Sequence, residues 1–340
     1  MTQSKLGGLH CGSRIAWPLR RIANPVVSHL GSSNLPCRAI NKYPNTSGNM
    51  TPAQMIGIAV VFLLLLLYQK TRRAILFILL SYKLVFKFFK FRPSNNRAWV
   101  NDNKFTASIS WNEDEVTIQN VRDFNWRTTR DFDERWIEKV VKPSMVKNIW
   151  FVLEYFDPIH RQLAHTILSF EFEDGTFLAC SIEARREKGE RYHPVTGMLR
   201  QFELIYVWGT EEDLIGVRSR CRKKSTTHLF KAKILREESK QLLLESYFRR
   251  TEQLNKKPEW YNSITNTCTT NIAHHVNEVY PGRIPKSFAI LLPGLSPKLL
   301  EQNNLVEIET TMDDLLLTSI IDEKSLEWDK ATSFSEYIRT

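Results

Sequence analysis

The first 100 residues contain no Asp or Glu, and this absence divides the chain into two unlike parts. They hold 14 Lys and Arg, whereas residues 101–340 hold 33 Lys and Arg against 37 Asp and Glu. The formal net charge of +10 therefore comes from the N-terminal part, and the remainder carries −4. Because a nucleic-acid footprint is expected as a basic patch on the folded domain, the sequence argues against a nucleic-acid partner.

Cysteine is scarce as well, with five residues at irregular spacing, and only three of them follow residue 100. This odd, sparse set does not indicate a disulfide framework, and no Cys/His spacing indicates a structural zinc. A Gly-rich phosphate loop is also lacking. We therefore expect neither a metal nor another cofactor.

The N-terminal part contains a 14-residue run, residues 55–68, without a charge or an amide. An uncharged helix could extend over residues 51–69, close to the length that spans a bilayer. A second apolar stretch, 74–82, leads into KLVFKFFKFR, whose lysines fall on one helical face. We predict that residues 51–91 contact membrane lipids, either as one span or as a hairpin that turns at the basic QKTRR segment, 69–73. The hairpin is the preferred interpretation, and it places the body on the outer side.

The chain outside the membrane segment divides further by composition. Residues 1–49 are basic and lack clear periodicity, which indicates a disordered tail or a misannotated start upstream of Met50. Residues 102–306 are long enough for one well-cored domain. Residues 307–340 form an acidic tail whose end is expected to be loosely ordered.

Within the body, β-type segments come first and helical patterns come last. Strands are predicted at 106–118 (as a pair), 148–155, 165–172, 177–183, 202–208 and 226–234, and helices at 237–253 and 268–280. The EDG sequence at 173–175 is typical of a hairpin turn. This order predicts an α+β fold rather than an alternating α/β fold.

Cys268 follows TNT at the predicted start of a helix, where orphan amides and the helix dipole favour a thiolate. A nucleophilic thiol needs a general base, and His165 opens a predicted strand. Ser181 and Glu183 share one face of the neighbouring strand, close to the expected position of His165. These residues suggest a catalytic Cys–His pair; the alternative is a small buried cysteine and a histidine that satisfies a local hydrogen bond.

Other histidines are weaker candidates for the base. His274 and His275 lie six and seven residues beyond Cys268 on the same helix, about 9–10 Å along its axis. The other three histidines of residues 102–306, which are His160, His193 and His228, are expected at the surface.

Several blocks in order resemble a known family: RDFDERW, AHTILSFEFEDGTFLACSIEARREKGERYHP, GMLRQFELIYVWGTEEDLIGVR and EWYNSITNTCTTNIAHHV. Together they look like the Lnb-type N-terminal periplasmic domain family of bacteria, over about residues 110–300. The family resembles circularly permuted papain-like folds of the NlpC kind, in which the histidine strand precedes the cysteine helix. The resemblance thus implies a permuted papain-like domain.

By the same resemblance, Cys268 in NTCTTN would be the nucleophile, His165 in AHT the base and Glu183 in SIEAR the polar third member. Arg185 would hold an acidic substrate group or pair with a nearby glutamate. Asn266 and Thr267, in the NTCTTN motif, are candidate substrate contacts.

The expected function is a membrane-anchored thiol hydrolase or acyltransferase, of the cysteine peptidase or amidase type, acting on an amide or ester in the cell envelope. Its substrate would be an envelope peptide, glycan or lipid, and its location the bacterial inner membrane with the domain in the periplasm. The alternative is a non-catalytic envelope module that binds a partner through the Arg- and Trp-rich segment 122–136.

Overall fold

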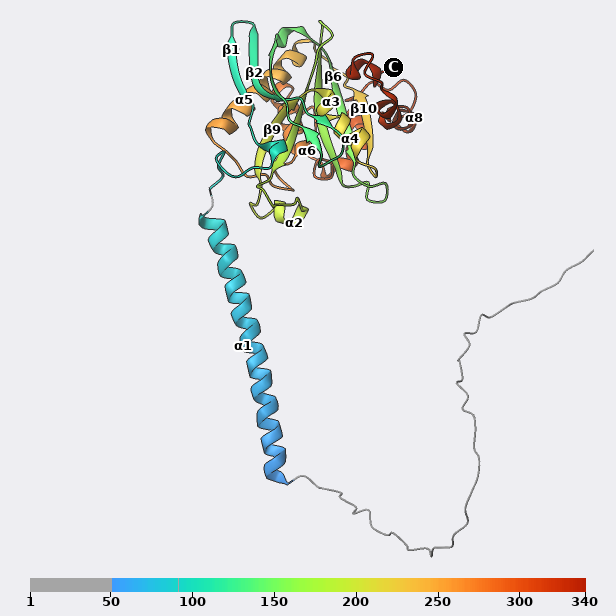
Figure 1. Ribbon diagram of the computed structural model, residues 1–340. Helices are drawn as coiled ribbons and strands as arrows, with labels where there is room; N and C mark the ends of the chain where they lie inside the picture. Colours follow the sequence, from blue (N-terminus) through green and yellow to red (C-terminus); the bar gives the residue numbers. More distant parts are fainter. Residues whose placement is uncertain (1–50, 91) are drawn as a thin grey trace, which may run out of the picture. The chain divides into compact units, whose positions relative to one another are not determined.

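The computed structural model describes residues 51–90 and 92–340 (Figure 1). The prediction of a disordered tail or a misannotated start, 1–49, lies outside the described residues. The described chain consists of a long N-terminal helix and a folded body, which is reached at about residue 92.

The N-terminal segment forms one continuous helix, α1 (Pro52–Lys90). Thr51 caps it, because its hydroxyl accepts a hydrogen bond from the backbone N–H of Gln54 and the Gln54 side chain accepts one from the Thr51 N–H. Its residues 52–83 are long and apolar enough to cross a membrane. At 1.5 Å per residue they extend about 48 Å, which exceeds the hydrocarbon thickness of a bilayer.

The preferred hairpin is therefore wrong: residues 69–73, where the turn was expected, are helical. These residues are Gln, Lys, Thr, Arg and Arg, so no Gly or Pro interrupts the helix. Thr71 instead donates its hydroxyl to the carbonyl of Leu67 one turn earlier, at 2.5 Å. The single-span alternative agrees with the structure.

The body is built on an eight-stranded sheet with the order β1-β2-β9-β8-β7-β6-β10, in which β5 also pairs with β2. All its neighbours are antiparallel except β2 and β9. The strands are β1 (Ser108–Asn112), β2 (Glu115–Arg122), β5 (Trp136–Val141), β6 (Val146–Tyr155), β7 (Ala164–Phe172), β8 (Phe177–Arg185), β9 (Glu203–Gly209) and β10 (Thr226–Lys231). A separate two-stranded pair joins β3 (Asn125–Trp126) to β4 (Phe132–Asp133).

Helices cover both faces of this sheet (Figure 1). They are α2 (Pro194–Gly197), α3 (Glu211–Leu214), α4 (Gly216–Cys221), α5 (Glu238–Lys256), α6 (Cys268–Val279), α7 (Ser296–Gln302), α8 (Met312–Thr318), α9 (Asp322–Glu327) and α10 (Phe334–Tyr337). Short 3₁₀ helices occur at Asn101–Asn103, Pro143–Met145, Phe288–Ile290 and Pro293–Leu295.

The two faces form two separate cores because side chains alternate along each strand. On β7, Leu168 and Phe170 pack with α5 and α6, whereas Ile167 packs on the other side with residues of α3 and α10. The central strands are buried on both faces, so they read as nearly continuous apolar runs.

The predicted α+β class is confirmed, and the elements that form the expected site lie close to their predicted bounds. Strands β7 and β8 are joined by the expected tight turn, in which Gly175 has a φ of +79° that favours glycine. The helix predicted from Cys268 is α6, which begins at that residue.

The acidic tail is folded rather than loosely ordered. Phe334 and Ile338 are buried in the second core, and Arg339 makes two hydrogen bonds of 2.7 Å to the buried carboxylate of Glu211. The guanidinium of Arg339 also lies over the rings of Trp150 and Phe177. The apolar residues of this tail are widely spaced among charged ones. Its composition alone therefore does not indicate which of its residues are buried.

Candidate active site

Cys268 is the first residue of α6, and its position is fixed by the cap that starts the helix. The Thr267 hydroxyl accepts the N–H of Thr270, while the Thr270 hydroxyl accepts the N–H of Thr267, which makes a reciprocal capping box. Asn271 adds hydrogen bonds of 2.8 Å to the Thr267 carbonyl and to the side chain of Asn266. The thiol is 4% exposed and lies in the first turn, where the helix dipole stabilises negative charge.

His165 lies on β7 and is held by two residues of β8. Its Nε2 is 2.7 Å from Ser181 Oγ and 3.2 Å from Glu183 Oε1. Ser181 donates to the same carboxylate oxygen at 2.7 Å, so the imidazole connects to Glu183 both directly and through the hydroxyl. Because Nε2 is engaged in this way, Nδ1 is the ring nitrogen left to face the thiol.

A buried arginine on α4 completes the arrangement on the far side of Glu183. Arg218 donates from Nη2 to Glu183 Oε1 at 2.6 Å, and its Nε lies 3.1 Å from Glu154 Oε2. Glu154, directly opposite His165 in the β6–β7 pairing, also accepts two hydrogen bonds from Arg222, at 2.7 and 2.8 Å. Arg218 and Glu154 are almost fully buried, so each charge is compensated by a partner of opposite sign.

Cys268 lies next to His165 at the point where strands β7 and β8 separate. Strand β7 pairs with β6 from Ala164 onward, but with β8 only from Ile167. Beyond that point the N–H and hydroxyl of Thr166 are available to the thiol, and both lower the pKa of Cys268. Thr269 Oγ1 lies 3.7 Å from the sulfur and 3.3 Å from the Thr166 hydroxyl.

Thiol and imidazole change each other's protonation. Burial raises the pKa of Cys268, but the charge and hydrogen bonding of His165, with those of Thr166, lower it overall to about 7. Burial lowers the pKa of His165, but the charges of Glu183 and Cys268 outweigh it and raise the value to about 9. The pKa of Glu183 is well below its usual range: burial opposes this, and the charges of His165 and Arg218 overcome it. Between about pH 7 and 9 the pair therefore exists as thiolate and imidazolium.

Comparison with known proteins agrees with this part of the chain. Residues 132–294 match the family model described as the Lnb N-terminal periplasmic domain. The match covers 163 of the 340 residues. No curated protein and no solved structure matches the chain, so the likeness to permuted papain-like folds stays a prediction. Together with α1, the match indicates a membrane-anchored protein with a periplasmic domain.

Within this Lnb domain the structure brings together Cys268, His165 and Glu183, which the sequence proposed as a set. Sequence reasoning placed Ser181 on the right strand face without giving it a role, and it missed Arg218 and Thr166. Arg218 ends the GMLRQFELIYVWGTEEDLIGVR block that carries the resemblance, but its partners Glu183 and Glu154 lie far away in the sequence, so no spacing indicated its role. Thr166 contributes because it lies where strands β7 and β8 separate, and no residue pattern in the sequence indicates that position.

The three proposed substrate contacts of the Lnb domain are placed differently. Arg185 is buried and donates to the carbonyls of Asn103 and Lys104 and to the side chain of Asn95, so its donors hold the first segment of the body. Its hydrogen bonds go to these three residues and not to Glu183 or Glu187, and a contact between Arg185 and substrate stays a prediction. Asn266 and Thr267 organise the start of α6, and their contact with substrate stays a prediction.

One histidine prediction is wrong, and a second histidine lies in the core away from the thiol, in agreement with its expected distance from Cys268 along α6. His228 is buried rather than exposed, and its Nδ1 lies 3.0 Å from Ser319 Oγ. His275 lies in the core, between Tyr206 Oη at 2.8 Å and Ser246 Oγ at 2.6 Å, and burial lowers its pKa to about 3. Neither histidine adjoins the thiol.

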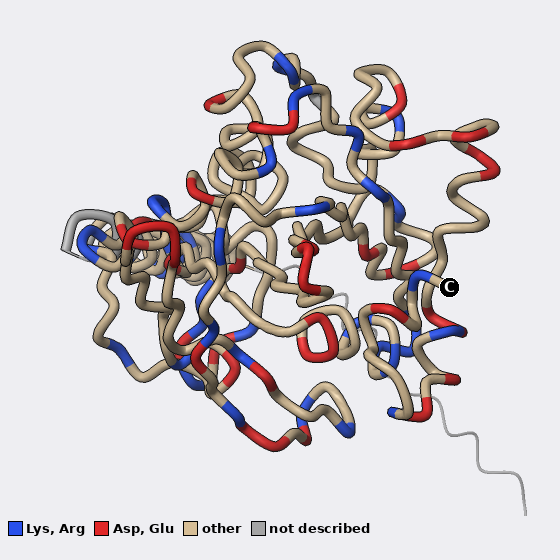
Figure 2. Tube along the Cα trace, turned by 90° about the horizontal axis from the view of Figure 1, so that it is seen from above, with Lys and Arg blue, Asp and Glu red and all other residues tan. Residues whose placement is uncertain are grey.

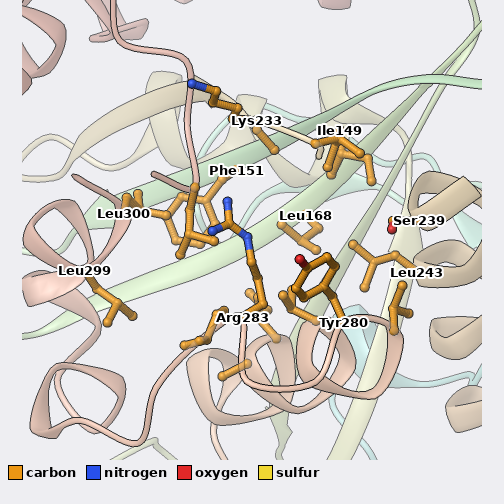
Figure 3. A pocket seen from close by; sticks show the side chains of 18 of the residues that line it. Ile149, Phe151, Leu168, Lys233, Ser239, Leu243, Tyr280, Arg283, Leu299 and Leu300 are labelled. Carbon is orange, nitrogen blue, oxygen red and sulfur yellow. The ribbon is translucent and has the colours of Figure 1, made fainter. Parts of the chain in front are cut away.

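An apolar pocket runs along α6 beside the site (Figure 3). Its helix wall consists of Thr269, Ile272, Ala273, Val276, Val279 and Tyr280, which share one face of α6. Leu168 and Phe151 on the sheet and Leu299 and Leu300 on α7 form other walls. The space open to the centre of a water-sized sphere is about 110 Å³. Its lining on α6 starts at Thr269, the residue after Cys268, and includes Val279 at the end of the helix; Cys268 and His165 themselves do not line it.

Proposed function

We propose that this protein is a thiol-dependent acyl-transfer enzyme, a hydrolase or acyltransferase, anchored in the bacterial inner membrane with its Lnb domain on the periplasmic side. The observation that carries the proposal is the thiol at a helix N-terminus, next to a histidine whose other nitrogen is held by Ser181 and Glu183. Such an arrangement is suited to nucleophilic attack on an amide or ester carbonyl.

The proposed reaction has two steps. The Cys268 thiolate attacks the carbonyl carbon, and the leaving group departs with the proton of the His165 imidazolium, which leaves an acyl thioester on the enzyme. His165 then takes a proton from water or from an acceptor amine or hydroxyl, which attacks the thioester and restores the thiolate. The dipole and first-turn amides of α6 stabilise the oxyanion that forms in each step.

The apolar pocket favours a substrate that carries an acyl chain. It starts at Thr269, adjacent to the sulfur, and its helix wall is apolar as far as Val279. An acyl chain on Cys268 would therefore have an apolar surface to extend along. The polar groups of a peptide or glycan would find few hydrogen-bond partners there. An anchor such as α1 would keep the site close to acylated envelope components.

The rival function, partner binding through segment 122–136, is less well supported. Arg122 forms a buried bidentate pair with Asp213, and Trp126 donates to the same carboxylate at 2.7 Å. Phe124 is buried in the same cluster and stacks on Phe132. These side chains are used within the fold, and the charges of the body are mixed in sign across the described chain (Figure 2).

The test is to trap the acyl-enzyme. Full-length protein in lipid nanodiscs is incubated with p-nitrophenyl acetate and with a long-chain p-nitrophenyl ester, and nitrophenol release and protein mass are followed. We expect a burst and an acyl adduct on Cys268, both lost in Cys268→Ala and retained in Cys221→Ala, which changes a partly buried free cysteine at the end of α4. Equal turnover by Cys268→Ala would refute the proposal.

A further inference from the structure

One edge of the central sheet carries both the site and an unusual concentration of exposed apolar side chains. Strand β6 ends at this edge and β7 begins there, and β8 ends there where β9 begins. The connections at this edge are the β6–β7 loop (156–163) and the β8–β9 connection with α2 (186–202). The loop that leads into α6 (257–267) reaches the same edge, because Trp260 and Tyr261 pair with the first residues of β9. We call these three segments the rim loops.

The rim loops expose large apolar residues far more often than the rest of the body does. Of the 17 exposed large apolar side chains in the described body, 8 lie in these loops, which comprise 36 of its residues. The most prominent are Phe156, Ile159, Leu163, Val195, Leu199 and Ile264. Ile159 is 80% exposed. Patches of this kind on a folded domain mark contact with another molecule or with a membrane.

The β8–β9 connection and the loop that leads into α6 pack against each other. This packing fixes the two loops whose apolar side chains Val195, Leu199 and Ile264 are exposed to solvent. Gly197 in α2 approaches Ser263 so closely that a β-carbon would lie 2.2 Å from the Ser263 hydroxyl. Asn262 donates to the carbonyl of Met198, and the Tyr192 ring packs edge-on against Tyr261. Figure 1 shows α2 standing out from the body at this edge.

The charge of the rim loops differs from that of the body. They hold six Lys and Arg against four Asp and Glu, whereas residues 101–340 as a whole have a net charge of −4. Two of the four acids are paired with arginines outside the loops, Glu187 with Arg97 and Glu259 with Arg250. Lys188 and Arg191 are exposed. One of the six bases, Arg186, is likewise paired outside the loops, with Asp102. Apolar side chains among a surplus of positive charges suit an anionic lipid surface.

The chain enters the body at the same edge. Ser94 donates its N–H to Glu203, the first residue of β9, and Asn95 binds Arg185, the last residue of β8. Only three residues lie between Lys90, the last residue of α1, and Ser94, which limits the separation of their Cα atoms to about 14 Å. A membrane helix connected so closely keeps this edge within reach of the bilayer.

We propose that the rim loops bind the surface of an anionic lipid bilayer, with Ile159, Val195 and Ile264 inserted among the headgroups. This contact holds the Cys268 end of the sheet against the membrane from which the helix emerges. The contact does not depend on the chemistry of Cys268, so it can be tested separately from the proposed activity.

The experiment uses full-length protein with a photoreactive diazirine amino acid at one position, in nanodiscs of phosphatidylcholine with or without phosphatidylglycerol. Positions 159, 195 and 264 are compared with Met145 and Leu317, exposed apolar residues outside the rim loops. After irradiation, lipid adducts are identified by mass spectrometry. We expect at least five times more adducts at the rim positions, unchanged in Cys268→Ala and reduced in a Lys188→Glu, Arg191→Glu double variant when phosphatidylglycerol is present.

Equal labelling of rim and control positions would overturn the proposal, and so would an absence of lipid adducts at the rim. Protein–protein adducts at the rim in place of lipid adducts would also overturn it, since they would assign the surface to a protein partner. Lipid adducts at the rim in a protein without esterase activity would support the membrane contact and count against the proposed function alone.

Discussion

Replacing His165 with alanine is expected to raise the pKa of the Cys268 thiol by at least about two units. The wild-type value is about 7, against an ordinary 9.0, although burial alone would raise it. The difference corresponds to about 2.7 kcal/mol of preferential stabilisation of the thiolate, at 1.36 kcal/mol per unit. His165 is the largest cause of the lowering, so its loss should return the pKa to 9 or above.

The assay is the rate of iodoacetamide labelling of Cys268 across pH 5–10, read by mass spectrometry of the Cys268 peptide. The pH at half-maximal rate gives the pKa directly and does not depend on how nucleophilic each thiolate is. Wild type should show a midpoint near pH 7, and a second change near pH 9, where the imidazolium loses its proton. His165→Ala should show one midpoint at pH 9 or above.

The matched control is His274→Ala, an exposed histidine on α6 that does not adjoin the thiol. Its midpoint should stay near pH 7. If His165→Ala also kept a midpoint near 7, the helix dipole and Thr166 would be sufficient to set the pKa. The thiolate–imidazolium pair, and the reaction built on it, would then be refuted.

Three further predictions follow from the same site. Arg218→Met leaves the buried Glu154 and the partly buried Glu183 each short of a partner and should cost about 3–5 kcal/mol in urea unfolding. Arg222→Met should cost clearly less, since Arg222 is partly exposed and Arg218 still holds Glu154. Thr267→Ala removes the cap of α6 and should destabilise the domain by about 1 kcal/mol in the same assay, with an upward shift of the labelling midpoint. Ala273→Leu narrows the pocket, so it should lower kcat/KM for the long-chain p-nitrophenyl ester at least tenfold and leave the acetate ester nearly unaffected.

The parts of the fold that the sequence predicted are those governed by local patterns. Alternation along β7 and β8 with the EDG turn at 173–175 determined the register that brings Glu183 opposite His165. The TNT sequence before Cys268 indicated a helix start, because Thr is a favourable cap. The α+β class followed from the order of such elements.

The features that the sequence did not predict are one local helix and two sets of interactions between distant segments. The charge cluster at residues 69–73 resembles a loop, yet its residues are good helix formers and the helix continues through them. Arg185 stands two residues after Glu183 in the motif, but residues 95–104 fold over it and take its donors. Arg218 meets Glu183 only through the packing of α4 on the sheet, which no local pattern encodes.

The burial of the C-terminal segment has a consequence for the biosynthesis of the protein. The apolar residues of β7 and β8 that face α3 and α10 are covered in part by Phe334 and Ile338. Phe334 is synthesised 149 residues after Arg185, the end of β8. At about 5–20 residues per second this interval lasts roughly 7–30 s, during which part of the apolar face of the sheet remains exposed to solvent. The nascent domain is therefore expected to need a holding chaperone after its membrane helix has formed, and to be most sensitive to proteolysis during that interval.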